Sequence, residues 1–147
     1  SYETAIHGIN PAISTYAIDC PLFVPLVENG MFHVQNQLTA LTIKYYLQPL
    51  KQIGIDTLIL GCTHYPLLMD SIADFMGSGV SLIHPGLETA IYIEDFTLTQ
   101  NLQNNTSTKG SIRCFVSDNT EQFKKNMEQF IGFEPHISIE QIEIQDF

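Results

Sequence analysis

The sequence predicts an α/β fold, with an open and mostly parallel sheet flanked by helices. Short apolar runs of strand type alternate along the chain with longer amphipathic runs of helical spacing. The run Thr57–Leu60 is almost entirely apolar, which is typical of a central strand covered on both faces. A length of 147 residues corresponds to about one domain and is enough to bury a core.

Six elements are expected in the first 84 residues. They are a helix at 1–9, a strand at 13–18, a helix at 35–52, a strand at 57–60, a helix at 67–76 and a strand at 80–83. Asn10-Pro11 ends the first helix. The helix at 35–52 takes its apolar spacing from Leu38, Leu41, Tyr45 and Leu47, with Pro49 as a late interruption. Proline suits the first turn of a helix, so Pro66 introduces the third, and Gly77 ends it.

Four elements are expected in the remainder of the chain. They are a helix at 86–99, a strand at 112–116, a helix at 121–131 and a strand at 136–144. Residues 101–110 are rich in Asn, Thr and Ser and predict an irregular connection.

Residues 56–68 carry the main chemical signal. An apolar strand ends at Gly61, and the next side chains are those of Cys62, Thr63 and His64. Open α/β sheets bind ligands at the carboxyl ends of their strands. Backbone N–H groups and the helix dipole there favour an anion, either a thiolate or a bound carboxylate. The alternative is that Cys62 is a small buried residue, as free cysteines usually are. The polar residues that follow it favour an active site.

The string Gly-Cys-Thr-His-Tyr-Pro at 61–66 resembles the second-cysteine signature of glutamate racemases, cofactor-independent members of the aspartate/glutamate racemase superfamily. Three other segments extend the resemblance. Residues 19–30 resemble that family's Cys-Pro-x-Phe-Val-Pro-Leu-Val-Glu segment, residues 82–86 a turn at a strand end, and residues 113–132 the final strand and helix.

The resemblance implies two lobes. Residues 1–84 would form the second lobe, which carries the Gly-Cys-Thr-His motif, and residues 85–147 would return to complete the first. The family's first cysteine, in an Asn-Thr motif, and its Asp-Ser pair do not occur in the 147 residues. We therefore expect the later part of a longer racemase, inactive alone. We also expect exposed apolar surface on residues 85–147, where the missing N-terminal lobe would pack.

The same resemblance assigns roles to four residues. Inversion of an α-carbon needs acid/base groups on both faces, and Cys62 matches one of the two cysteines that serve the family. Thr63 matches a substrate-binding threonine, although it could simply cap a helix. His64 matches a histidine that assists proton transfer, and Glu28 matches a carboxylate that assists the same cysteine. No cofactor motif and no metal-binding cysteine spacing is present.

The other cysteines and histidines suggest structural roles. Cys114 lies in an alternating strand and is expected in the core, and Cys20 receives the same interpretation. Three histidines match no motif and are expected at the surface or in packing: His7, His33 and His136.

Composition limits the partners. A net charge of −10 disfavours nucleic acid and anionic membranes, and no apolar run is long enough to span a bilayer. Three widely spaced cysteines suggest reduced thiols in the cytoplasm. The expected function is L- to D-glutamate racemisation for peptidoglycan synthesis, in a possible homodimer. The alternative is a non-catalytic or degenerate module that binds an acidic amino acid or a partner.

Overall fold

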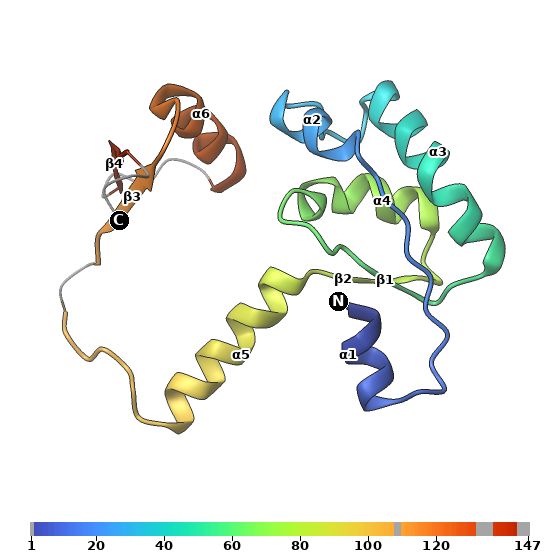
Figure 1. The fold of residues 1–147 in the computed structure, drawn as a ribbon, viewed down its shortest axis with the longest axis horizontal. Coiled ribbons are helices and arrows are strands. Elements are labelled where there is room, and N and C mark those ends of the chain that lie inside the picture. The colour runs from blue at the N-terminus through green and yellow to red at the C-terminus, as the bar shows by residue number, and fades with distance from the viewer. Residues whose placement is uncertain (1, 108–109, 132–136, 144–147) are drawn as a thin grey trace. The chain divides into compact units, whose positions relative to one another are not determined.

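The computed structural model describes residues 2–107, 110–131 and 137–143. The chain divides into two compact units, residues 1–84 and 85–147. Each unit combines helices with a two-stranded parallel sheet (Figure 1). The α/β class with parallel strands is therefore confirmed.

The first unit contains seven described elements. They are the helices α1 (Tyr2–Ile9), α2 (Phe23–Glu28) and α3 (Gln37–Ile53), the strand β1 (Thr57–Ile59), the 3₁₀ helix η1 (Tyr65–Leu68), the helix α4 (Met69–Met76) and the strand β2 (Ser81–Ile83). Strands β1 and β2 pair in parallel, with Leu58 opposite Leu82. Parallel neighbours need a crossover, and η1 with α4 provides it.

The core of this unit lies among α2, α3, η1 and α4, which pack on one another. Its most deeply buried apolar side chains are Phe23, Val27, Ile43, Leu68 and Ile72. Phe23 meets the rings of Tyr46 and Tyr65 edge-on, with centroids 5.5 and 5.2 Å away. Helix α2 is short, but its buried aromatic residue fixes it to the rest of the unit.

Helix α3 has well-defined ends. The side chain of Asn36 accepts a hydrogen bond from the backbone N–H of Thr39 at 3.2 Å, which satisfies a free donor of the first turn. Gly54 follows the last residue with φ 79°, a left-handed conformation that glycine adopts without strain.

The buried face of α3 differs from the expected one. Of the four apolar positions that predicted the helix, only Leu47 is buried, whereas Leu38, Leu41 and Tyr45 are exposed. Thr39 and Thr42 are buried instead. Their hydroxyls donate to the backbone carbonyls of Met31 and Leu38, so their burial leaves no hydroxyl unpaired.

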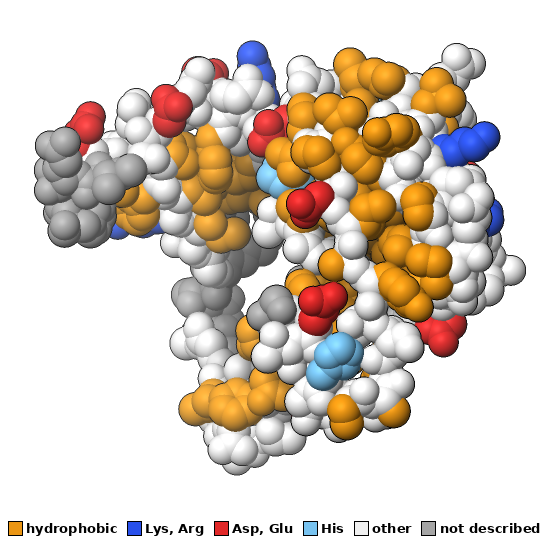
Figure 2. Space-filling view, turned by 45° about the vertical axis from the view of Figure 1, so that its right-hand side comes forward, with side chains coloured by type: hydrophobic (Ala, Val, Ile, Leu, Met, Phe, Trp, Pro, Cys, Tyr) orange, Lys and Arg blue, Asp and Glu red, His pale blue; other side chains and the backbone are white. Residues whose placement is uncertain are grey.

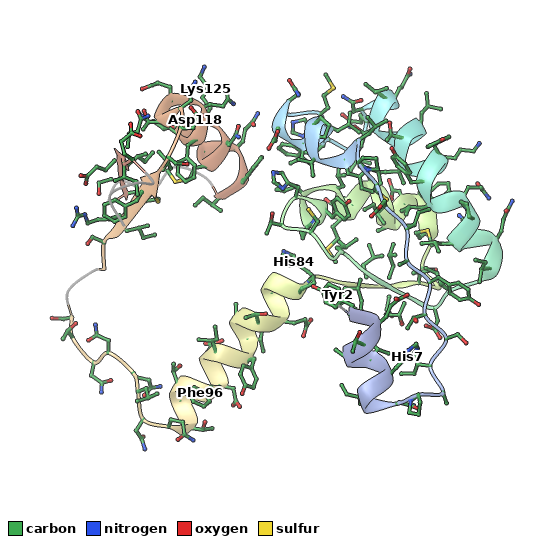
Figure 3. All side chains as sticks on the ribbon, in the orientation of Figure 1. Tyr2, His7, His84, Phe96, Asp118 and Lys125 are labelled. Carbon is green, nitrogen blue, oxygen red and sulfur yellow. The ribbon has the colours of Figure 1, made fainter. Side chains whose placement is uncertain are left out.

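One strand prediction for this unit was wrong, and another was right about the strand but wrong about its position in the sheet. Residues 13–18 form no strand. His7 extends from α1 (Figure 3), and its ring lies 3.0 Å from the Ile13 carbonyl and 3.2 Å from the Thr15 hydroxyl. Strand β1 is not central, because β2 is its sole partner among the described residues. Thr57 is accordingly exposed. A strand requires neighbouring backbone, which local composition cannot specify.

The second unit contains the helix α5 (Pro85–Thr99), the strand β3 (Ile112–Val116), the helix α6 (Thr120–Ile131) and the strand β4 (Ile137–Gln141). Strands β3 and β4 pair in parallel along five residues, and α6 packs on β4. The four predicted elements are confirmed, and their observed ends lie no more than a few residues from the predicted ones. His136 and Ile144, the ends of the last predicted strand, lie outside the described residues.

Apolar surface is exposed throughout the second unit. Neither α5 nor α6 contains a buried residue among those described. Exposed side chains of α5 include Leu87, Ile91, Tyr92, Ile93, Phe96 and Leu98. The space-filling view shows such hydrophobic side chains open on the surface (Figure 2). The expected exposure of apolar groups on this segment is confirmed.

Candidate active site

Cys62 lies in a tight loop between β1 and η1. The N–H groups of Gly61 and Cys62 donate to the carbonyls of Ile59 and Leu60, at 3.0 and 2.9 Å. Gly61 lies against the ring of Tyr2, since a β-carbon there would stand 3.0 Å from Tyr2 Cε2. The predicted helix after the loop is confirmed, but its first turn is the 3₁₀ helix η1, and α4 follows it.

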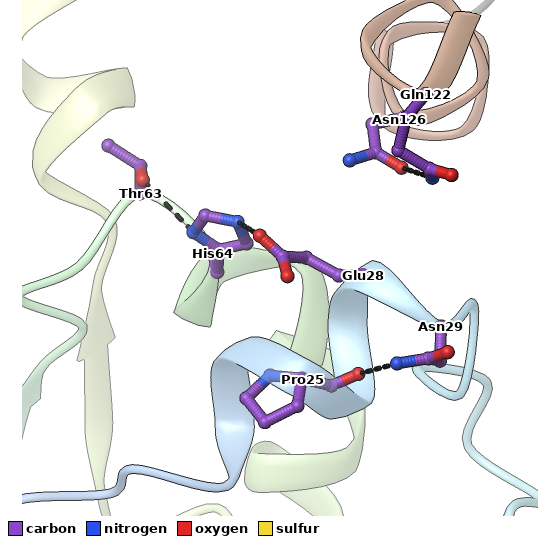
Figure 4. A network of polar contacts seen from close by, with 7 residues as sticks. All are labelled: Pro25, Glu28, Asn29, Thr63, His64, Gln122 and Asn126. Atoms are coloured by element: carbon purple, nitrogen blue, oxygen red, sulfur yellow. Dashed lines mark hydrogen bonds and ion pairs between the residues drawn. The ribbon is translucent and has the colours of Figure 1, made fainter. Parts of the chain in front are cut away.

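Thr63, His64 and Glu28 form a row of polar side chains (Figure 4). The Thr63 hydroxyl lies 3.2 Å from His64 Nδ1, and a Glu28 carboxylate oxygen lies 3.4 Å from His64 Nε2. In a neutral imidazole with the proton on Nε2, that proton faces the carboxylate and Nδ1 accepts the hydroxyl proton. A protonated ring would face the carboxylate as an ion pair. Glu28 therefore contacts the histidine at the end of α2, 36 positions away in sequence.

Tyr65 is a residue of the motif to which sequence reasoning gave no role. Its hydroxyl donates to the backbone carbonyl of Cys20 at 3.3 Å. Burial raises the pKa of Tyr65, and the charges of Cys20, Cys62 and Asp19 act in the same direction. The sequence signal that could have singled out Tyr65 was its position in the motif, between His64 and Pro66. Its partner could not be inferred from that position, because Cys20 lies 45 residues earlier.

The three cysteines differ in environment, and all are free thiols. Cys20 is buried with 3% exposure, and burial followed by the Asp19 carboxylate raises its pKa to about 11. Its predicted burial is confirmed. Cys114 is half-buried in β3, opposite Ile139, so its placement in the core was wrong. Strand β3 lacks a cover among the described residues that would bury it fully.

Cys62 and Tyr65 line a groove of about 880 Å³ in the first unit. Helix α1, residues 13–20 and β1 provide most of its other walls, and Cys20 and Asp19 also border it. Thr63, His64 and Glu28 do not line it. The structure thus brings Thr63, His64 and Glu28 together, and it places Cys62 in a groove that those three residues do not line.

Within the described residues, no group of three or more His, Cys, Asp or Glu side chains is placed to hold a metal ion. No helix in the same ranges is long and apolar enough to cross a membrane.

No family model matches the chain, but individual known proteins do, among them glutamate racemases. Glutamate racemase 2 of Caldanaerobacter subterraneus subsp. tengcongensis is 40% identical over 132 residues, which are 90% of this chain and 49% of that protein. The glutamate racemase of Listeria monocytogenes serotype 4a is 35% identical over 144 residues, or 98% of this chain and 53% of that protein. This chain is a partial glutamate racemase-like segment.

Solved structures agree with this assignment. The glutamate racemase of Francisella tularensis subsp. tularensis SCHU S4, in complex with D-glutamate, matches with a TM-score of 0.86 and 32% identity. The match covers 99% of this chain and 53% of that one. The isoform RacE1 of Bacillus anthracis matches with a TM-score of 0.85 and 29% identity, over 97% and 52% of the two chains. The racemase-like segment therefore spans about half the length of its relatives.

Proposed function

We propose that this racemase-like segment is part of an enzyme that interconverts L- and D-glutamate without a cofactor, with Cys62 as one of two acid/base groups. The observation that carries the proposal is Cys62 at the carboxyl end of β1, beside the Thr63–His64–Glu28 row, in a chain 40% identical to a glutamate racemase. The second group would belong to the half that the relatives have in addition. With it absent, the segment alone would be inactive.

The chemistry supports a second base outside the segment. Inversion requires one group to take the α-proton and another to return a proton on the opposite face. Cys20 is unsuited to this role, because its thiol is buried and a pKa near 11 leaves very little thiolate at neutral pH. Cys114 lies in strand β3 of the other unit. Cys62 thus remains as the sole base that we assign within the chain.

The neighbours of Cys62 suit supporting roles. The imidazole of His64 could return protons to the thiolate, and the Glu28 carboxylate 3.4 Å from Nε2 would stabilise the imidazolium formed in that cycle. Thr63 would bind the substrate carboxylate through its hydroxyl or N–H. To do so, its hydroxyl would exchange its contact with His64 Nδ1 for one with substrate.

The proposal extends to the cellular setting. The D-glutamate product would enter peptidoglycan synthesis, which bacteria carry out from cytoplasmic precursors. The missing N-terminal lobe would cover the apolar surface of the second unit, and the enzyme could form a homodimer. Residues 1–84 would then be the second lobe, and residues 85–147 the returning part of the first.

Kinetics of the full-length protein, meaning this segment joined to its other half, provide the test. The Cys62→Ala variant should lose nearly all inversion in both directions, whereas Cys114→Ser, a matched thiol change, should leave it near normal. Thr63→Ala should raise KM roughly ten- to hundredfold, because hydrogen bonds to charged groups contribute about 1.5–3 kcal/mol. His64→Ala should mainly lower kcat.

Circular dichroism of glutamate, with deuterium incorporation from heavy water, measures both inversion and α-proton exchange. Near-normal turnover of Cys62→Ala would overturn the proposal. A full-length protein that binds glutamate but exchanges no α-proton would favour the non-catalytic binding module. Inversion by the 147-residue segment alone would contradict the requirement for a second base outside it.

A further inference from the structure

Tyr65 connects the Cys62 loop to the start of α2. Its hydroxyl donates to the carbonyl of Cys20 at 3.3 Å, three residues before that helix begins. Its ring meets the ring of Phe23, the first residue of α2, edge-on at 5.2 Å and 82°. Phe23 is 1% exposed, so Tyr65 attaches the loop to the rigid core of the unit.

His64 connects the same loop to the other end of α2. Glu28, whose carboxylate oxygen lies 3.4 Å from His64 Nε2, is the last residue of the helix. Two consecutive residues of the loop thus contact the two ends of a six-residue helix. A loop that is held at two separate points has little freedom to tilt. Cys62 is two positions before His64, the first of these points.

Tyr65 also shares a groove with two of the cysteines. Cys20, Cys62 and Tyr65 line the same groove. Burial is the main cause of the raised pKa of Tyr65, and negative charge on Cys20 or Cys62 would raise it further. The hydroxyl therefore stays protonated at neutral pH and can keep donating to the Cys20 carbonyl.

We propose that Tyr65 is a positioning residue for Cys62: through Cys20 and Phe23 it holds the loop so that the thiol points at the substrate α-carbon. This inference rests on the proposed racemase function. Proton abstraction depends steeply on geometry, because the thiolate must approach the α-proton along one direction. Substrate binding, which we assign to Thr63 and to the other half, should depend on Tyr65 much less.

Tyr65→Phe in the full-length protein tests the proposal, since it keeps the ring contact with Phe23 and removes only the hydroxyl. A net hydrogen bond is worth about a two- to tenfold change, so we expect kcat to fall by roughly that factor with KM changed less than about twofold. The two-base scheme adds a directional readout. Exchange of the α-proton should slow for the enantiomer that Cys62→Ala can no longer exchange, and stay normal for its mirror image.

Tyr46→Phe is the matched control. The Tyr46 ring also meets Phe23 edge-on, at 5.5 Å, but its hydroxyl takes no part in the Cys20 contact. It should leave kcat and both exchange rates unchanged. Equal losses in the two variants would show a general packing effect and would overturn the proposal. Normal kcat in Tyr65→Phe, a loss confined to KM, or an equal slowing for both enantiomers would also overturn it.

Thiol labelling separates this inference from the racemase proposal. In the 147-residue chain, iodoacetamide labelling of Cys62 followed by peptide mapping requires no enzymatic activity. Tyr65→Phe should speed labelling by about two- to tenfold, because a loop released from Cys20 exposes its half-buried thiol more often. Tyr46→Phe should not. An unchanged or slower rate would overturn the link between Tyr65 and Cys62, whether or not the full-length protein racemises glutamate.

Discussion

The two units share one kind of architecture and differ in burial. Each has a two-stranded parallel sheet accompanied by helices. All eleven buried apolar side chains of the described residues lie in residues 1–84, and none in residues 85–147. The first unit places α2, α3 and α4 on one another, whereas α5 packs closely on no other described element. A helix with apolar side chains contributes to a core only where the chain also provides its cover.

The difference bears on how the segment relates to its relatives. The relatives are about twice as long, and the uncovered surface belongs to the unit that we propose returns to their other half. The thiols, the polar row and the groove belong to the unit that has its own core, apart from Cys114. The candidate site is therefore built on the self-sufficient part of the segment.

The largest contrast is expected from two isoleucines in helices. Ile43 is fully buried in α3, and Ile91 is 52% exposed in α5. Ile43→Ala should reduce the free energy of unfolding by about 2–5 kcal/mol, since it removes buried methyl groups and leaves a cavity. Ile91→Ala should change it by less than about 0.5 kcal/mol.

Urea unfolding of the 147-residue chain, followed by far-ultraviolet circular dichroism, measures both changes. A loss above about 1 kcal/mol for Ile91→Ala would mean that α5 is packed in solution. Joining the segment to its other half should then make Ile91→Ala costly if that half covers the helix.

The second contrast concerns two thiols. Burial raises the pKa of Cys20 from 9.0 to about 11, which lowers its thiolate fraction at neutral pH by about a hundredfold. Cys20 should therefore be alkylated at least about a hundredfold more slowly than Cys114, which is half-buried. Mass spectrometry of labelled peptides gives both rates, and equal rates in urea provide the control. Comparable native rates would contradict the burial of Cys20.

The same shift predicts a pH dependence. The folded state holds the Cys20 proton more tightly than the unfolded state, so its stabilising contribution is complete below about pH 9. That contribution is lost as pH rises from about 9 to 11. The stability of Cys20→Ala should therefore decline less over this interval, and parallel curves for the two proteins would refute the assignment.

The smallest contrast compares two asparagine caps. Asn36 accepts from the N–H of Thr39 at the start of α3, and Asn119 accepts from the N–H of Gln122 at the start of α6, at 3.2 and 3.0 Å. Asn36→Ala should lower the unfolding free energy by about 1 kcal/mol. Asn119→Ala should instead speed hydrogen exchange in α6 with no shift of the main urea midpoint, because no described residue of that helix is buried. If both variants shifted the main urea midpoint, the two units would unfold together.

Much of the local structure could be predicted from the sequence. Most helices and strands appear where periodicity placed them, because apolar spacing and end signals such as Pro66 and Gly77 act over a few residues. Helix α2 was not predicted, because its six residues are too few to show a helical period. The strand at 13–18 failed because an extended segment becomes a strand only when another strand pairs with it. The buried face of α3 was misjudged because Thr39 and Thr42 are buried with satisfied hydroxyls, whereas Leu38 and Leu41 are exposed.

The sequence by itself determined the α/β class, the Gly-Cys-Thr-His-Tyr-Pro loop after a strand, and the resemblance to glutamate racemases. These depend on local order and on residue identity, which the chain carries at every position. The tertiary structure alone decided that Glu28 meets His64 and that Tyr65 meets Cys20 and Phe23. Those contacts join residues 36 to 45 positions apart, and packing of the intervening helices brings them within reach.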